Sequence, residues 1–522
     1  MRSSRAGWSV AGLIAGYAGL AASYCMAMVL TTRDAPVTAI AERIIRLTPG
    51  PVVERAIKVL GHWDKPFLLL VILLGAGAAF AWAGLLARRS WWAPVIVYGV
   101  LALVGAAAVR WQPRGATIDL LPVAVGFATW LVCLSLLTEP LRRLAAAPEP
   151  APGSAPPAGT EHTRRTFLLR AGLILGASVA AGGVGRVVGR GRRHVEEARR
   201  LLRLPGVTEP TLPPGVRLDV EGITPWATRA EDFYRIDTAF VVPAIEPVDW
   251  RVRIHGLVER EVVLTYQQLI NRRMTQAWIT LNCVSNEVGG DLIGNAWWSG
   301  VRLADLLEEA GVQPGADAVL QTSEDGWTCG TPLSVLTDSR DAMLAVAMNG
   351  RPLPIEHGFP VRTIVPGLYG YVSACKWVVD IEVTRFADIE AYWTQRGWAE
   401  KGPVKIASRI DVPRGGGEIA TGGARVAGVA WAQHTGIQAV EVSVDDGPWQ
   451  RAALGTVPSS DTWVQWAATL DLAPGDHVLA VRAIDAHGET QTGEEHGTVP
   501  DGATGWHRIK VTAVEPDEDE EG

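Results

Sequence analysis

A cysteine at the end of a predicted strand is the residue of this chain that is best placed for metal chemistry. Cys283 lies in TLNCVSNEVGGDLIGNAWWSGVRLADLLEEAGV, which starts as a strand, continues as a loop rich in Gly and Asn, and ends in a helix. A strand end fixes a side chain, and the loop beyond it leaves access for a cofactor. A thiolate there is a soft, strongly donating metal ligand. Taken alone, a single buried cysteine is more often inert packing.

The elements around Cys283 are predicted from the apolar pattern. The helix after the loop ends before Gly311 and carries one apolar face, made of Leu303, Leu306, Leu307 and Ala310. The chain has five cysteines, with no C-x-x-C pair and no regular spacing, which argues against a zinc module or a disulfide scaffold. Any cysteine chemistry therefore depends on single residues.

The charge of the chain excludes one class of partner. The net charge of -7 comes largely from an acidic tail at 516–522, and such a run is typical of a solvated end. The sequence contains no basic block, so we do not expect nucleic-acid binding.

Residues 1–146 read as an α-helical membrane region. A spanning helix needs about 20 mostly apolar residues, because its backbone must be satisfied within the segment. Four segments meet this requirement, with Trp and Arg at several ends as interfacial anchors: 8–30, 66–86, 91–109 and 118–137. None of the ten histidines lies inside these four segments, which disfavours a transmembrane haem. The region is thus expected to serve as an anchor, a docking site or a quinone site.

The arginines at the ends of these segments predict an orientation. Cytoplasmic ends carry an excess of Lys and Arg, and three places qualify: Arg2 and Arg5, Arg88 and Arg89, and Arg142 and Arg143. The connection between the first two segments is also basic, although acidic residues accompany its cations.

Residues 147–205 are predicted to hold a linker and an export signal. The first part, 147–162, is rich in Pro, Ala and Gly and is expected to be extended. In TRRTFLLRAGLILGASVAAGG, Arg164 and Arg165 precede a modest apolar run that ends in small residues, which resembles a twin-arginine export signal. That route carries folded proteins and so implies a buried cofactor. The alternative is an ordinary fifth span, and both hold if the signal is not cleaved. In either case the chain after about residue 190 lies outside the cytoplasm.

A second long motif identifies a family. The segment AMNGRPLPIEHGFPVRTIVPGLYGYVSACKWV, with NGRPLP, HGFPVR, VPG and KW in order, resembles the molybdopterin domain of the sulfite oxidase family. The resemblance implies a mixed α+β catalytic domain over 206–400. It also implies a molybdenum cofactor with one molybdopterin, in which Cys283 is the metal ligand and a catalytic residue.

The same resemblance implies how the cofactor is held. It places the pterin phosphate and ring against His357, Arg362, Ser373 and Lys376. Upstream, EDFYRIDTAFVVP places Tyr234 and Arg235 near the pterin or a bound oxyanion, which Arg235 would polarise as a second catalytic residue. Judged without the motif, His357 reads as a satisfied core histidine, Arg362 as half of an ion pair and Arg235 as a surface arginine.

From residue 401 to 515 the pattern changes to short alternating strands. Val440, Val442 and Val444 alternate with polar residues, and Asp446 with Gly447 is predicted to close a hairpin. Several such strands indicate a β-sandwich. In the family that the chain resembles, an immunoglobulin-like domain of this kind follows the catalytic domain and makes a homodimer contact. The resemblance covers roughly residues 206–514.

The sequence departs from the sulfite oxidase pattern around the substrate. Val288 stands where many sulfite oxidases have an arginine, Trp398 stands about where they have a tyrosine, and VPDGATGWHRIKV lacks a further arginine. Each lost charge-assisted hydrogen bond to sulfite costs about 1.5–3 kcal/mol. A neutral or larger substrate such as a sulfoxide therefore fits at least as well. The segment SEDGWTCG contains Asp325, Trp327 and Cys329, which could line the substrate pocket. For these three residues we favour an ordinary turn over a position in the pocket.

The sequence thus predicts a membrane-anchored oxidoreductase that transfers an oxygen atom to or from a small substrate outside the cytoplasm. It has no haem-binding C-x-x-C-H, so a separate electron partner, a quinone or a cytochrome, is expected. The alternative is a catalytically weak, membrane-tethered binding or assembly module that retains the pterin fold. Molybdenum content distinguishes the two hypotheses.

Overall fold

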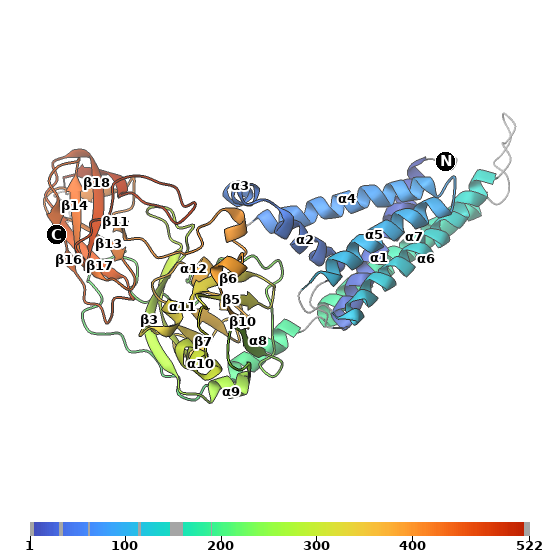
Figure 1. Cartoon of the computed structure of the whole chain (residues 1–522). Helices are drawn as coiled ribbons and strands as arrows, with labels where there is room; N and C mark the ends of the chain where they lie inside the picture. The colour runs from blue at the N-terminus through green and yellow to red at the C-terminus, as the bar shows by residue number, and fades with distance from the viewer. Residues whose placement is uncertain are drawn as a thin grey trace. The chain divides into compact units, whose positions relative to one another are not determined.

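The computed structural model describes residues 5–30, 35–60, 63–112, 116–146, 160–188 and 191–515 (Figure 1). The chain divides into two compact units, Met1–His194 with Ala239–Pro243, and Val195–Thr238 with Ala244–Gly522. Arg2, most of the predicted linker and the acidic tail at 516–522 lie outside the described residues.

The first unit is helical. Five of its helices are long and apolar enough to cross a membrane: α1 (Arg5–Val29), α4 (Asp64–Leu86), α5 (Trp92–Arg110), α6 (Leu121–Ala146) and α7 (Thr160–Val188). The first four form where the sequence predicts spans, and the fifth holds the twin-arginine-like segment. Two short amphipathic helices, α2 (Pro36–Leu47) and α3 (Gly50–Leu60), and the turn η2 (Thr117–Leu120) were not predicted.

Small residues bring these helices together. A Cβ atom added to Gly12 of α1 would lie 2.1 Å from the Phe80 carbonyl oxygen of α4, so the two backbones touch. Helix α7 packs against α1 and α6. The Arg170 guanidinium of α7 also pairs with Glu139 of α6 at 2.5 Å. Helix α7, which carries the twin-arginine-like segment, is therefore an integrated member of the helix bundle, and it begins at Thr160, inside the predicted linker.

The second unit begins with two sheets and short helices. One sheet has the order β2-β1-β10-β5-β6, with β1 and β10 parallel and the other pairs antiparallel. Its strands are β1 (Arg251–Gly256), β2 (Val262–Thr265), β5 (Ala318–Ser323), β6 (Thr328–Pro332) and β10 (Val378–Thr384). The other sheet has the order β3-β4-β7-β8, with β9 paired to β7. Its strands are β3 (Thr275–Asn282), β4 (Ile293–Arg302), β7 (Met343–Met348), β8 (Arg351–Pro352) and β9 (Arg362–Ile364).

Helical segments connect these strands and complete the mixed α+β architecture. They are α8 (Gly191–Leu201), α9 (Tyr266–Ile270), α10 (Leu303–Ala310), α11 (Leu333–Thr337), α12 (Gly370–Ser373), η3 (Ile355–His357), η4 (Phe386–Asp388) and η5 (Thr394–Arg396). Helix α10 matches the predicted helix, and its apolar face is buried in a core shared with β1, β7 and β10. This core fixes the ends of the strands that border the site.

The last third forms two facing sheets (Figure 1). One contains β11 (Ala407–Val412), β13 (Ala424–Trp431), β16 (Ala453–Leu454) and β17 (Val464–Leu470). The other contains β12 (Glu418–Ala420), β14 (Ile437–Val444), β15 (Gln450–Arg451), β18 (Gly475–Asp485) and β19 (His507–Val514). Both sheets contribute to one apolar core, so this part is a β-sandwich, as predicted.

The hairpin after β14 differs from the prediction by one residue. Its central residues are Asp445 and Asp446, with φ of 51° and 58°, and the Gly447 amide donates to the Val444 carbonyl oxygen at 2.8 Å. Aspartate tolerates the left-handed conformation that such a turn requires. The glycine therefore closes the turn instead of lying at its centre.

Candidate active site

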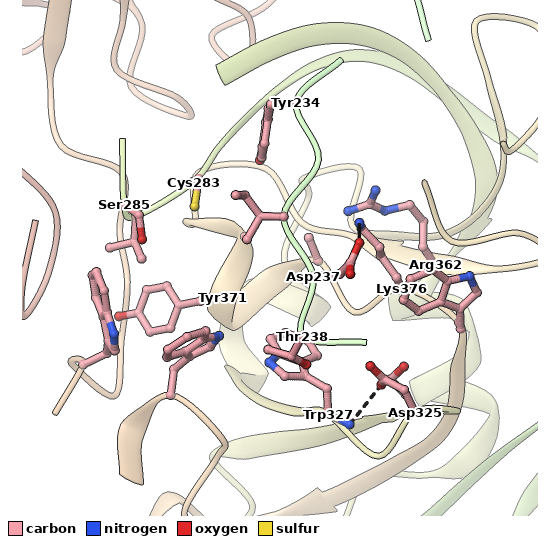
Figure 2. Close-up of a pocket in the computed structure, with 18 of the residues that line it drawn as sticks. Tyr234, Asp237, Thr238, Cys283, Ser285, Asp325, Trp327, Arg362, Tyr371 and Lys376 are labelled. Atoms are coloured by element: carbon pink, nitrogen blue, oxygen red, sulfur yellow. Dashed lines mark hydrogen bonds and ion pairs between the residues drawn. The ribbon is translucent and has the colours of Figure 1, made fainter. Parts of the chain in front are cut away.

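Cys283 is the first residue after β3, as the sequence predicts. Its amide donates to the Leu292 carbonyl oxygen at 2.9 Å, and the Asn286 side chain accepts from the Leu292 amide at 2.9 Å, which closes the loop. The cysteine is 9% exposed and borders a cavity (Figure 2). Burial raises the pKa of the Cys283 thiol, although hydrogen bonds from Ser285 and the charge of Lys376 oppose the shift. A bound metal ion would reverse this preference, because coordination deprotonates a thiol.

The cavity contains about 830 Å³ of space free of protein atoms, part of it continuous with solvent. Segments distant in sequence form its wall: residues 233–238, the loop after β3, the turn between β5 and β6, and the chain from α12 to β10. Seven of its side chains are aromatic: Phe233, Tyr234, Trp327, Tyr371, Trp377, Trp393 and Trp398. A flat heteroaromatic ring would find apolar walls of matching shape here.

The cavity has two chemically different ends (Figure 2). One end contains Asp237, Arg362 and Lys376, with His357 beside it, and we call it the cofactor end after the role that the sequence predicts for its cations. The other end contains Cys283, Ser285, Tyr371 and Trp398, and we call it the substrate end after the role predicted for the region of Trp398; the Tyr371 and Trp398 rings lie 5.9 Å apart there.

Arg362 is a buried cation at the cofactor end. It is 5% exposed, donates to the His357 carbonyl oxygen at 3.1 Å, and stacks over the Trp298 ring at 5.2 Å. Within residues 191–515 it forms no ion pair. Burial lowers its pKa to about 10. A buried charge without a counter-ion is costly, so the guanidinium calls for an anion from a ligand.

Lys376 is the second buried cation. Its ammonium lies 3.3 Å from Asp237, whose carboxylate also pairs with Arg235 at 3.0 Å. Burial lowers the pKa of Lys376 to about 8, and the Asp237 carboxylate opposes the shift.

His357 is a neutral imidazole behind these cations. Its Nε2 atom lies 2.9 Å from the Ala230 carbonyl oxygen, while its buried Nδ1 atom has no hydrogen-bond partner in the described part of the chain. Burial, with the charges of Lys376 and Arg362, lowers the pKa of His357 to about 4. Gly358 follows with φ of 107°, and a Cβ atom there would lie 2.9 Å from the Cβ atom of Arg362. This close approach explains the glycine of HGFPVR.

The other two predicted cofactor-binding residues are engaged elsewhere. The Ser373 hydroxyl donates to the Tyr369 carbonyl oxygen at 2.9 Å, at the end of α12. The Arg235 side chain is 44% exposed and directed to Asp237. The cavity wall thus brings together Tyr234, Cys283, Arg362 and Lys376 from the predicted set. The binding and catalytic roles given to all seven residues remain predictions.

The structure adds residues that the sequence analysis missed or judged unfavourably. Asp237, Tyr371 and Trp393 line the cavity without having been singled out. Asp325 and Trp327, for which a turn was favoured, do form one, since Asp325 accepts from the Trp327 amide at 3.1 Å, but both also line the cavity. The aromatic richness of AYWTQRGW was the one available signal for the substrate end.

These groups fit a molybdenum cofactor with one molybdopterin. Among the described residues, the arrangement offers a soft sulfur donor, aromatic walls, a buried arginine without a carboxylate and a histidine nitrogen without a partner. Cys283 would hold the metal, and Arg362 with Lys376 would hold the phosphate. When bound, the cofactor supplies two-electron oxygen-atom transfer, while the chain supplies position and charge.

Fold and site together define a molybdopterin-dependent oxidoreductase, and comparisons with known proteins agree. Residues 239–393 match the family described as "Oxidoreductase molybdopterin binding domain". The uncharacterised oxidoreductase YuiH of Bacillus subtilis is 33% identical over 153 residues, which cover 29% of this chain and 74% of that protein. Mitochondrial sulfite oxidase of Drosophila melanogaster is 28% identical over 353 residues, covering 55% of this chain and 60% of that enzyme. The chain belongs to the sulfite oxidase family of molybdenum-cofactor oxidoreductases.

Among solved structures, the sulfane dehydrogenase SoxCD of Paracoccus pantotrophus is similar with 24% identity and a TM-score of 0.48. The match covers 61% of this chain and 90% of that one. The chain spans less than two thirds of the Drosophila enzyme, so similarity to the whole enzyme leaves the substrate and partners to be proposed.

Proposed function

We propose that this protein is a membrane-anchored oxidoreductase that transfers an oxygen atom to or from a small, sulfoxide-like or sulfite-like substrate outside the cytoplasm. The observation that carries the proposal is the cavity beside Cys283, in which two buried cations, Arg362 and Lys376, lie at the end away from Cys283. The cations suit a phosphate-bearing cofactor, which leaves the end near Cys283 for the substrate.

A neutral sulfoxide fits the substrate end better than sulfite. Arg362 and Lys376 belong to the cofactor end, and the wall near Cys283 is formed by Ser285, Tyr371 and Trp398. The indole N–H of Trp398 is buried and has no acceptor within residues 191–515. This N–H is closed off from the cavity, so a sulfoxide oxygen would reach it only after the Trp398 ring shifts. A neutral donor of this kind then suits a sulfoxide oxygen, whereas a sulfite dianion needs charge-assisted hydrogen bonds.

The membrane anchor is supported by the five long apolar helices and the arginines at their ends. Arg5 is the first residue of α1, Arg88 and Arg89 separate α4 from α5, and Arg164 and Arg165 lie in the first turns of α7. A common cytoplasmic location for these arginines places the second unit outside the cytoplasm. The packing of α7 in the bundle supports its retention as a fifth span.

Electron exchange and assembly complete the proposal. A quinone or a cytochrome exchanges electrons with the cofactor, because the sequence carries no covalent haem motif. The C-terminal sandwich is an immunoglobulin-like domain that pairs two copies of the chain as a homodimer.

The test is the molybdenum content and dye-linked activity of the wild type beside Cys283→Ser, with sulfite and methionine sulfoxide as substrates. We expect the variant to lose at least about 1000-fold in turnover, equivalent to ~4 kcal/mol of transition-state stabilisation. Cys25→Ser is the matched control, because Cys25 is a partly buried cysteine of α1. A wild type that holds no molybdenum when produced with ample cofactor would contradict the proposal and favour the binding or assembly module.

A further inference from the structure

Asp237 is a buried carboxylate at the cofactor end to which the proposed chemistry gives no role. Its Oδ2 atom lies 3.3 Å from the Lys376 ammonium and 3.0 Å from the Arg235 guanidinium. The side chain of Asp237 is 6% exposed, that of Lys376 is 10% exposed and that of Arg235 is 44% exposed. The three residues therefore form a chain of charges that runs from solvent to the cavity wall.

We propose that Asp237 is a positioning residue that holds the Lys376 ammonium in the cavity wall for the phosphate of the pterin cofactor, while Arg235 fixes Asp237 from the solvent side. This inference rests on the proposed function and deepens it. It also gives Arg235 a supporting role in place of direct contact with a substrate oxyanion.

The hydrogen-bonding capacity of Lys376 agrees with this role. A lysine ammonium has three N–H donors on a flexible four-carbon stem, so one partner restricts its position and leaves two donors for a ligand. Asp237 is that partner, and it belongs to segment 233–238, which itself lines the cavity. A phosphate bound between Arg362 and Lys376 would find the ammonium already oriented.

Asp237 also helps to keep Lys376 protonated against the other charges around it. Arg362 and Arg235 disfavour the protonated lysine, His357 is neutral, and the Trp377 ring lies 5.4 Å from the ammonium. The pKa of Lys376 is about 8 with Asp237 present. Without the carboxylate, the ammonium would lose its proton more readily and attract phosphate less.

The experiment compares Asp237→Asn with Asp237→Glu, which keeps the charge, and with Asp232→Asn. Asp232 is the matched control, because it directly precedes segment 233–238 and pairs with Arg229 at 2.7 Å but is 53% exposed. The first readout is the rate at which molybdenum and pterin leave the purified protein on dialysis. We expect Asp237→Asn to lose both about tenfold faster than the wild type, the equivalent of one pKa unit. The other two variants are expected to remain within about 1.5-fold of the wild type.

A second readout is the affinity of the cofactor-free protein for inorganic phosphate. We expect Asp237→Asn to bind phosphate about tenfold more weakly, with rescue by Asp237→Glu. Equal cofactor loss in Asp237→Asn would overturn the inference, since it would show that the carboxylate does not affect cofactor binding. Slower loss would overturn it as well, since it would show that the carboxylate competes with phosphate for Lys376. If Asp237→Asn does not fold, the same two measurements are made on Arg235→Gln, for which we expect a change of about threefold in the rate of cofactor loss and in phosphate affinity. Wild-type values in Arg235→Gln would also overturn the inference.

The two proposals fail in different ways. A wild type without molybdenum contradicts the proposed function, whereas the phosphate measurement still tests Asp237. A loaded wild type whose cofactor loss is unchanged in Asp237→Asn contradicts the role of Asp237 alone.

Discussion

The two ends of the cavity are built from different kinds of side chain. At the cofactor end, Arg362 and Lys376 are buried cations whose local charges are only partly compensated. At the substrate end, Cys283 faces Tyr371 and Trp398, and the walls are aromatic. The cofactor end matches the long family motif, whereas the departures from that motif cluster in residues predicted to act on the substrate. A family can thus keep the means of holding its cofactor while the chemistry of the substrate wall changes.

Among the variants that test the difference between the two ends of the cavity, Arg362→Met is expected to have the largest effect. If Arg362 binds the phosphate as proposed, the variant would lose two charge-assisted hydrogen bonds at ~1.5 kcal/mol each, so cofactor affinity should fall about 100-fold. The free energy of unfolding of the cofactor-free protein should not decrease, because a buried cation without a carboxylate has been removed. Molybdenum per chain and thermal unfolding of the cofactor-free protein measure the two effects.

Arg340→Met is the matched control for this prediction. Arg340 is also well buried, but its guanidinium pairs with Asp338 at 2.8 Å. We expect this variant to be less stable by about 1–3 kcal/mol and to keep its cofactor affinity. If Arg362→Met kept full cofactor affinity, the assignment of the cofactor end would be wrong.

The next largest effect is expected on the free energy of unfolding at low pH, through His357. Because its pKa is about 4 in the folded protein and 6.5 ordinarily, the unfolded chain binds the proton more tightly between these values. The free energy of unfolding of the cofactor-free protein should therefore be highest above pH ~6.5 and fall by ~2 kcal/mol as the pH approaches 4.5. Thermal unfolding across this range should show a weaker acid dependence in His357→Gln.

His477 provides the control of opposite sign. Its pKa is raised by the hydrogen bond to Asp445, so its contribution is present at low pH and is lost as the pH rises through the raised pKa. His477→Gln should therefore steepen the loss of stability in acid. An unchanged acid dependence in His357→Gln would show that His357 is not the neutral buried group described.

At the substrate end, Trp398→Phe tests the unpaired indole N–H while keeping an aromatic ring. Loss of one neutral hydrogen bond, about 0.5–1.5 kcal/mol, should raise KM for methionine sulfoxide roughly three- to tenfold. The molybdenum content should not change, because Trp398 lies away from the cofactor end. Trp506→Phe is the control, since its indole N–H donates to the Gln491 carbonyl oxygen within the sandwich. A loss of molybdenum in Trp398→Phe would contradict the division of the cavity into two ends.

The sequence predicted those parts of the site whose pattern lies within a few consecutive residues. Cys283 at a strand end, helix α10 and the alternating strand β14 follow from periodicity over a few residues. The long motif indicated Arg362, which begins β9, and Lys376, which precedes β10, and the fold brings both to the cavity wall. The four early apolar helices were equally clear, since their signal is a continuous apolar run.

Other features depend on contacts between distant segments. Asp237 and Lys376 are 139 positions apart, and no local pattern indicates that they pair. Tyr234 and Arg235 are neighbours in a segment without regular structure, where one side chain enters the cavity wall and the next points to Asp237. The packing of the segment decides which of the two side chains enters the cavity wall. The sequence alone could therefore not assign different roles to Tyr234 and Arg235.

The smallest effect is expected at Val288, where many sulfite oxidases have an arginine. Val288 is 37% exposed and lines a separate small pocket with Asn282 and Tyr369. Val288→Arg should therefore change KM for sulfite less than about twofold. Ser285→Arg also introduces an arginine, but in the cavity wall. An interaction of ~1 kcal/mol between this added charge and sulfite should raise the preference for sulfite over methionine sulfoxide about fivefold. If Val288→Arg shifted this preference more than Ser285→Arg, the loop after Cys283 would direct position 288, not position 285, toward the substrate.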